Sequence, residues 1–314
     1  MATEEERCNE ARKFQRIDDA FRSGDLEALR AAVDDPAAVP NGRLHDAIGT
    51  CLVYAVYRSP LAFIRTLLEI GADPNGPADD GFPSLIAALS SGREMPGATS
   101  RTDVDDVIRL LLSCGADPNQ RGINDYTALH MAVAERNPLA VQILLEAGAD
   151  PELRTRIDAC ETPLEMAETA GVTEIAGILA RKGQPIRQRL RSGLTLLLDI
   201  AGTGEPVRRQ HTYRVRLRLW LNTGEAVRWP SAWATEHLFR LADNGETLIT
   251  EVRVHRGSLV SGLFYGVEGM RVGGTRRLEI APHMAYREVG VPGVIPAGAA
   301  LVAEITILGA GGSG

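Results

Sequence analysis

One four-residue string, Gly-Ala-Asp-Pro, recurs three times in the first half of the chain and constrains its fold more than any other feature. The copies begin at Gly71, Gly115 and Gly148, and each follows a pair of leucines. They are 44 and 33 residues apart. A repeat with a period of roughly 20 to 50 residues is the signature of a solenoid, in which one short structural unit stacks on the next.

The residues around each copy indicate where one helix ends and where the next begins. A helix can end in Leu-Leu-x-x-Gly because glycine adopts the left-handed conformation after the last turn, and the Asp-Pro that follows directs the chain away from the helix axis. The next helix is expected to begin after a threonine N-cap such as Thr127 or Thr162. Each unit is therefore two short antiparallel helices and a projecting turn, and stacking buries their apolar faces.

Five such units are predicted between residue 12 and about residue 186. The 44-residue spacing gives the third unit 11 surplus residues, which we place in an insertion at Ser90–Ser100 because that stretch has turn formers and no apolar period. The first unit is atypical and charged on its exterior, as expected of a terminal cap. The units are expected at Phe21–Val39, Leu44–Asn75, Phe82–Asn119, Thr127–Glu152 and Thr162–Gly183.

The period and the motif resemble those of ankyrin repeats. A second signature of that family, Thr-Pro-Leu-His-x-Ala, matches Thr127–Ala132 and, more loosely, Thr162–Ala167. The resemblance implies an all-α solenoid over residues 1–186 that binds a protein client through its concave face and projecting turns. It also implies that His130 is a structural residue that bonds neighbouring turns. The recurrence of the three aspartates in the string makes them turn residues.

The second half of the chain has a different apolar period. A basic segment at residues 187–193 is interpreted as a linker, after which Leu194–Ile200 and Tyr213–Leu221 are predicted to be strands. In the second strand arginines alternate with apolar side chains. Such a row of arginines suits either a phosphate-binding stripe or the solvated outer face of a half-buried sheet. We favour the second interpretation because no aromatic side chains are interleaved with the arginines.

The C-terminal stretch carries the most specific motifs of the sequence. They lie at Gly269–Pro282, Ala285–Tyr286, Gly290–Pro296 and Ala299–Val302. These segments resemble the C-terminal half of the FKBP-type peptidyl-prolyl cis-trans isomerases, strongly over residues 266–308 and weakly over residues 194–265. The resemblance implies an α+β domain at residues 194–308, a twisted antiparallel sheet around one short helix. A flexible glycine-rich tail is expected at residues 309–314.

The short helix is also predicted by the sequence pattern. Leu259, Leu263, Val267 and Met270 recur at helical spacing after Ser258, which we expect to be the N-cap. Three glycines in this stretch each cost the helix about 1 kcal/mol, so only packing against the sheet can hold it.

The chemistry that the resemblance implies is isomerisation of X-Pro peptide bonds, which needs no nucleophile, metal or cofactor. The barrier of about 18 to 20 kcal/mol arises because amide resonance is lost at the twisted midpoint. An apolar pocket that binds the twisted amide better than either planar form lowers the barrier, and a thousandfold acceleration needs about 4 kcal/mol of differential binding. The resemblance gives Tyr286, Val260 and Ile295 as proline-pocket candidates, with Leu217, Val227, Leu259, Leu263, Ala285 and Ala303 as further substrate-contacting positions.

Several of these positions depart from the family pattern. The family's Trp at the pocket floor falls on Leu263, its Tyr of the first long strand on Leu217, and its Phe of the final strand on Ala303. The Phe-Asp pair reads Val227–Arg228, and the Gly after Ala-Tyr is Arg287. Two functions therefore stay open: a weakly active isomerase whose ankyrin repeats recruit clients, and a non-catalytic interaction scaffold or chaperone.

The stretch between Arg228 and Ile249 is longer than the family's usual loop. Within it, Pro230–Leu241 is predicted to be an added helix. Two placements are open for it. In one, Trp229, Trp233 or Phe239 packs over or into the proline site; in the other, the helix lies on the outer surface with a small cluster of its own.

Charge and composition narrow the expected partners. The net charge of −7 divides into −14 over residues 1–180 and +7 over residues 181–314. The acidic first half favours a basic protein client and argues against nucleic acid, and a proline-containing segment is the expected second partner. No apolar run approaches the roughly 18 residues of a bilayer span. The acidic N-terminus and the four scattered cysteines favour a cytoplasmic protein. We expect it to bind no membrane, metal or cofactor.

Overall fold

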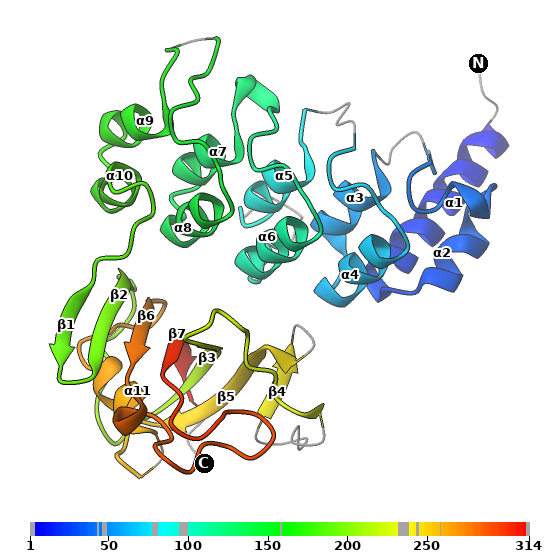
Figure 1. Cartoon of the computed structure of the whole chain (residues 1–314). Helices are drawn as coiled ribbons and strands as arrows, with labels where there is room; N and C mark the ends of the chain where they lie inside the picture. The colour runs from blue at the N-terminus through cyan, green and yellow to red at the C-terminus, as the bar shows by residue number, and fades with distance from the viewer. Residues whose placement is uncertain are drawn as a thin grey trace. The chain divides into compact units, whose positions relative to one another are not determined.

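The computed structural model describes residues 4–42, 44–45, 49–76, 81–93, 100–157, 159–231, 239–242, 245–257 and 259–311 (Figure 1). It divides the chain into two compact units, Met1–Gln184 and Pro185–Gly314. The first unit is built from helices, and the second contains a seven-stranded antiparallel sheet with, in its described residues, one short α-helix. The predicted fold class, an all-α ankyrin solenoid followed by an α+β domain, is confirmed.

Helix pairs stack along the first unit (Figure 1). The first helices of the pairs contact one another in the order α1, α3, α5, α7 and α9, and the second helices do so from α4 through α6 and α8 to α10. The α-helices are α1 (Glu4–Ser23), α2 (Leu26–Ala32), α3 (Cys51–Arg58), α4 (Leu61–Glu69), α5 (Ser84–Ser90), α6 (Val104–Ser113), α7 (Ala128–Ala134), α8 (Pro138–Glu146), α9 (Pro163–Thr169) and α10 (Thr173–Ala180).

The repeated glycine follows the end of α4, α6 and α8, as the sequence predicts. Gly71, Gly115 and Gly148 have φ of 95°, 89° and 91°, and a Cβ built on any of them would meet nothing within 4 Å. The backbone conformation, and not crowding, therefore favours glycine here. The amide of Ala72 then donates to the carbonyl of Leu67 at 2.9 Å, which closes the last turn of α4.

An asparagine ladder joins the turns of the first four helix pairs. The side-chain amide of Asn75 donates to the carbonyl of Gly115 at 2.8 Å, and its oxygen accepts from the amide of Asp117 at 2.6 Å. Asn41 and Asn119 also accept a hydrogen bond from the next turn. The aspartates of the repeated string each accept from the amide two residues later, as turn residues do: Asp73, Asp117 and Asp150.

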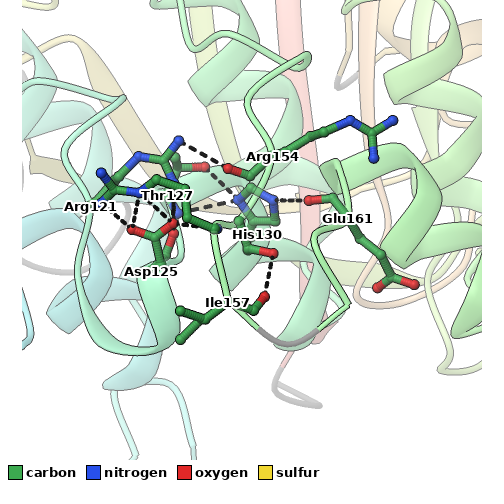
Figure 2. A network of polar contacts seen from close by, with 9 residues as sticks. Arg121, Asp125, Thr127, His130, Arg154, Ile157 and Glu161 are labelled. Carbon is green, nitrogen blue, oxygen red and sulfur yellow. Dashed lines mark hydrogen bonds and ion pairs between the residues drawn. The ribbon is translucent and has the colours of Figure 1, made fainter.

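His130 joins the fourth helix pair to the fifth (Figure 2). Its ring is fully buried, with Nδ1 2.9 Å from Oγ1 of Thr127 and Nε2 3.1 Å from the carbonyl oxygen of Glu161. Burial lowers the pKa of this imidazole. The prediction that His130 bonds neighbouring turns is confirmed.

A carboxylate between two arginines ties the same two projecting turns together. Asp125 accepts from Arg121 at 2.6 Å and from Arg156 at 2.5 Å. The hydrogen bonds from Arg156 lower the pKa of Asp125 to about 2. Asp125 and Asn124 both have positive φ, 58° and 54°, so this turn is tightly bent at the point where the ion pairs form.

The first helix pair is longer than predicted. α1 begins at Glu4, whereas the first unit was predicted to begin at Phe21. Phe14 and Ile17 precede Phe21 at helical spacing, and Ile17 is fully buried, so the helix extends to the N-terminal side of the predicted unit. Of the predicted insertion at Ser90–Ser100, residues 94–99 lie outside the described part of the chain.

The strands of the second unit are antiparallel to their neighbours and lie in the order β1-β2-β6-β7-β3-β5-β4. Buried residues of β2, β3, β6, β7 and α11 form a single hydrophobic core. These elements are β1 (Gln188–Arg191), β2 (Leu194–Ile200), β3 (Thr212–Leu221), β4 (Phe239–Ala242), β5 (Thr247–Arg253), α11 (Ser261–Gly266), β6 (Thr275–Ile280) and β7 (Leu301–Ala310).

Three segments of this unit differ from their predictions. Four residues of the predicted linker, Gln188–Arg191, form β1 and pair with β2. β7 continues to Ala310, so the first two residues of the predicted tail belong to the strand. α11 begins at Ser261 with Val260 as its N-cap, and Ser258 lies outside the described residues. β1 was missed because a short, basic edge strand lacks apolar alternation.

The predicted added helix is wrong where the structure describes it. Phe239 and the two residues after it lie in β4, which pairs with β5. Residues 232–238, including Trp233, lie outside the described part of the chain. Apolar residues at 239 and 241 suit a strand as well as a helix over so short a run, and pairing with β5 decides between them.

The arginine row of β3 is only partly solvated, which corrects the prediction of a solvated face. Arg214 is exposed, whereas Arg218 is buried and donates to Oγ1 of Thr247 at 2.7 Å. Glu304 lies opposite Arg218 on β7 and pairs with Arg277 of β6 at 2.7 Å. Arg218 and Arg277 are thus part of a polar row that crosses the four adjacent strands β5, β3, β7 and β6.

Candidate functional site

Two glycines of α11 allow the helix to lie directly on the sheet. A Cβ on Gly262 would come within 2.4 Å of Ile280, and one on Gly266 within 2.2 Å of Leu278. These glycines, which weaken the helix in isolation, are therefore required by its close approach to β6. The approach fixes the start of α11, where Leu259 and Val260 stand.

A buried arginine holds the other end of α11. One guanidinium nitrogen of Arg276 donates to the carbonyls of Gly266 and Glu268, at 2.8 Å each. The other two nitrogens bond both carboxylate oxygens of Asp199, at 3.0 and 2.8 Å. Arg276 was not predicted as a functional or structural residue from the sequence. The available signal was a pair of adjacent arginines in β6, because one of two neighbouring strand residues must face the helix side of the sheet.

The nine predicted pocket residues all belong to the hydrophobic core of the second unit or pack against it. Six of them are buried in that core: Leu217, Val227, Leu263, Ala285, Ile295 and Ala303. The other three are partly exposed and pack against it: Leu259, Val260 and Tyr286. Of the nine side chains, these three are therefore the most accessible from solvent.

The loop that carries Tyr286 is closed by its own backbone. Val291 and Ile295 exchange two hydrogen bonds of 2.8 Å, and the amide of Gly290 donates to the carbonyl of Tyr286 at 3.1 Å. Burial raises the pKa of the Tyr286 phenol, so the hydroxyl keeps its proton at neutral pH. It can therefore donate a hydrogen bond to a carbonyl oxygen brought to this loop.

Arg287 occupies the position at which the FKBP pattern has glycine, and its φ is 54°. Its amide donates to the carbonyl of Pro282 at 2.9 Å, and its own carbonyl accepts from Gly298 at 2.7 Å. The loop thus keeps a left-handed residue after the tyrosine although no glycine is present. That conformation costs an L-residue about 1 to 2 kcal/mol.

The positions at which the family pattern has aromatic walls are aliphatic and closed. Leu263, Leu217, Ala303 and Val227 are at most 7% exposed, so none of these positions is open to solvent. Of the three aromatic residues considered for this place, Trp229 packs against the core cluster, and its amide donates to the carbonyl of Gly245 at 2.9 Å. Phe239 lies in the edge strand β4.

At the position where the family pattern has an aspartate, this chain has Arg228. The Arg228 side chain pairs with Glu246 at 2.8 Å on the surface. The site therefore has no buried carboxylate at this point to polarise a bound amide, and the phenol of Tyr286 is the polar group among the nine candidates.

Comparison with known families places two domains in the chain. The family model for FKBP-type peptidyl-prolyl cis-trans isomerase matches residues 240–308, and the model for ankyrin repeats, in three copies, matches residues 97–190. The chain therefore contains ankyrin repeats followed by an FKBP domain.

Curated relatives resemble one or the other part of the chain. A putative ankyrin repeat-containing protein of Treponema pallidum is 35% identical over 116 residues, 36% of this chain and 35% of that protein. FK506-binding protein 1A of Neurospora crassa is 40% identical over 67 residues, 21% of this chain and 54% of that protein. FK506-binding protein 4 of Chaetomium thermophilum is 49% identical over 57 residues, 18% of this chain and 12% of that protein. The chain spans less than two thirds of each relative.

None of the helices in the described residues has both the length and the apolar character that a membrane crossing needs. Within the same residues, no three His, Cys, Asp or Glu side chains are grouped as metal ligands.

Proposed function

We propose that the FKBP domain isomerises X-Pro peptide bonds slowly and that the ankyrin repeats recruit the protein client that carries them. The observation that supports this proposal is that Leu259, Val260 and Tyr286, all partly exposed, pack against the buried and mainly aliphatic core of the FKBP domain. Such a surface removes water from a proline ring, and the protonated phenol of Tyr286 supplies one hydrogen bond to an adjacent carbonyl.

The expected rate is low because the aromatic walls are absent. An aromatic contact contributes about 0.5 to 1.5 kcal/mol beyond the area it buries. Losing four such contacts, about 2 to 6 kcal/mol in the transition state, lowers a rate by roughly 30-fold to 25,000-fold. Weak turnover, and not full family activity, is therefore the expected result.

The ankyrin repeats would compensate for a weak pocket. The net charge of −14 over residues 1–180 suits a basic client surface. A client held by the repeats presents its prolines to the tethered FKBP domain at a high effective concentration, so even a shallow site is used.

A protease-coupled assay of the full chain on a Xaa-Pro peptide tests this function. We expect turnover above the uncatalysed background that falls in Tyr286→Ala and falls less in Tyr286→Phe. Tyr57→Ala, at an exposed tyrosine of the ankyrin repeats, is the matched control and is expected to leave turnover unchanged. Turnover that is insensitive to Tyr286→Ala would overturn the proposal.

A non-catalytic interaction scaffold is the second candidate, and the buried aliphatic side chains at Leu217, Leu263 and Ala303 favour it. In that case proline-containing peptides would bind without being isomerised. Titration of such a peptide, followed by quenching of Trp fluorescence, separates the two functions because Trp229 packs against the cluster. Quenching without turnover supports the scaffold, whereas quenching with turnover supports the isomerase.

A further inference from the structure

Three arginines gather around two aromatic rings of α11, apart from the residues assigned to the proline site. We call Arg191, Arg209 and Arg256 the α11 arginine cluster. Arg191 comes from the edge strand β1 and Arg256 from the segment that leads into α11. The rings are those of Phe264 and Tyr265, the second of which is partly exposed.

The rings hold the guanidinium groups in defined places. The guanidinium carbon of Arg191 lies 4.0 Å from the ring centre of Tyr265, and that of Arg256 lies 5.6 Å from it. Arg256 also donates to the phenol oxygen at 2.6 Å. Arg209 lies 5.4 Å from the ring centre of Phe264. Cation–π contacts of this kind fix a guanidinium plane without neutralising its charge.

The cluster has more positive charge than its neighbours neutralise. Glu268 pairs with Arg209 and lies 3.7 Å from Arg191, so two of the three guanidinium groups share one carboxylate. Among the described residues, the hydrogen bond of Arg256 goes to a phenol and not to a carboxylate. The side chains of Arg191 and Arg209 are 50% and 63% exposed, which leaves donors accessible from solvent. Pro185–Gly314 as a whole has 16 arginines and 11 acidic residues, a net charge of +5.

The cluster lies close to the proline site along the chain. Arg256 precedes Leu259 by three residues, and the amide of Leu259 donates to the carbonyl of His255 at 3.3 Å. Because a chain spans at most about 3.6 Å per residue, the Cα atoms of Arg256 and Val260 are no more than about 14 Å apart. A peptide with its proline at Val260 therefore has residues two to four positions away within reach of Arg256.

We propose that the α11 arginine cluster binds acidic residues of the client segment, within about four residues of the proline that is bound at the site. This inference rests on the proposed binding of a proline segment by the FKBP domain. Guanidinium groups bind carboxylates through paired, charge-assisted hydrogen bonds, and rings that already fix the guanidinium groups reduce the entropy lost on binding. The substrate class is thus a proline flanked by Asp or Glu.

A charge series of labelled peptides tests the inference with the full chain. Each peptide has a central Ala-Pro and carries Glu, Gln or Lys at the second and third positions on both sides, and binding is followed by fluorescence anisotropy. At 25 mM NaCl the Glu peptide is expected to bind about tenfold more tightly than the Gln peptide, and the Lys peptide more weakly than either. At 500 mM NaCl screening is expected to remove most of the difference.

Two double variants test whether the α11 arginine cluster causes the preference for the Glu peptide. The double variant Arg191→Gln/Arg256→Gln is expected to bind the Glu and Gln peptides equally while keeping the affinity of the parent chain for the Gln peptide. Arg214→Gln/Arg240→Gln removes two exposed arginines elsewhere in the same unit and is expected to keep the preference for Glu. A control pair that abolishes the preference as fully as the cluster pair would overturn the assignment to the cluster.

The peptides also separate the two proposals from each other. Equal binding of the Glu and Gln peptides at 25 mM NaCl would overturn the arginine cluster, even if both bind and the proline site stands. A Glu peptide in which Ala replaces the proline tests the reverse case. If that peptide binds as tightly as the proline form and the Gln peptide does not bind, the cluster stands as an acidic-peptide site and the proline site fails. These comparisons need no variant, so they decide the question even if a variant fails to fold.

Discussion

Replacing Arg287 by glycine is expected to stabilise the FKBP domain. The residue has φ of 54°, a conformation that costs an L-residue about 1 to 2 kcal/mol and glycine almost nothing. Glycine itself loses about 0.5 to 1 kcal/mol more backbone entropy on folding. The net gain for Arg287→Gly is therefore about 0.5 to 1 kcal/mol.

The surroundings of Arg287 allow the substitution without other loss. Its side chain is exposed, and its structural contacts are made by the backbone, through the bonds to Pro282 and Gly298. A glycine keeps both of these bonds. The loop that carries Tyr286 is therefore expected to keep its shape while its strain is removed.

Scanning calorimetry measures the expected change. The unit from Pro185 to Gly314 has 130 residues. At about 2.1 cal/mol/K per residue its unfolding entropy is roughly 0.27 kcal/mol/K, so the gain raises its thermal midpoint by about 2 to 4 °C. Arg287→Ala is the matched control because it removes the side chain and keeps the left-handed backbone. An unchanged or lower midpoint for Arg287→Gly, or an equal rise for Arg287→Ala, would refute the strain argument.

Three further outcomes are expected. Arg276→Met removes the hydrogen-bond donors to two carbonyls and one carboxylate, so urea denaturation should show that the FKBP domain loses about 2 to 4 kcal/mol of unfolding free energy. A loss below about 1 kcal/mol would contradict the structural role given to these hydrogen bonds. The pKa of His130 is lower in the folded than in the unfolded chain, so the ankyrin repeats should lose stability as pH falls through about 6.5. In plots of the unfolding midpoint against pH, His130→Gln should reduce the slope below this pH. An unaltered slope would count against the role of His130. Asn75→Ala removes two ladder hydrogen bonds and should lower stability by about 1 to 2 kcal/mol, roughly twice the effect of Asn119→Ala; equal effects in denaturant titrations would oppose the ladder account.

The repeat unit could be predicted from the sequence because its signals are local. The glycine at the helix end, the threonine N-cap and the Asx turn each act within about five residues. The structure accordingly has left-handed Gly71 after α4 and a capping box at Thr162. Where a segment depends on a distant partner, local signals fail. Gln188–Arg191 resembles a linker until β2 pairs with it, and Phe239 joins a strand only because β5 lies beside it.

In the candidate site too, contacts between segments distant in the sequence could not be predicted. The nine candidate pocket residues were predicted from the family resemblance, and each lies in the hydrophobic core of the second unit or packs against it. Arg276 was missed because its partner Asp199 is 77 residues away in the sequence, and no local pattern links the two. The α11 arginine cluster was missed for the same reason, since Arg191 and Tyr265 come from elements far apart in the chain.

In α11, the residues that the packing of the helix requires differ from the residue at which the family pattern has an aromatic side chain. Gly262 and Gly266 admit no side chain, because a Cβ on either would overlap a side chain of β6. Leu263, between them, has no such restriction, and an aliphatic side chain fills its space where the family pattern has Trp. The chain thus keeps the residues that set the path of the helix and differs in those that would line an aromatic pocket. Under the proposed function, binding energy lost at the proline ring must come from contacts outside it, and the proposed role of the exposed arginines around Tyr265 is to supply such contacts.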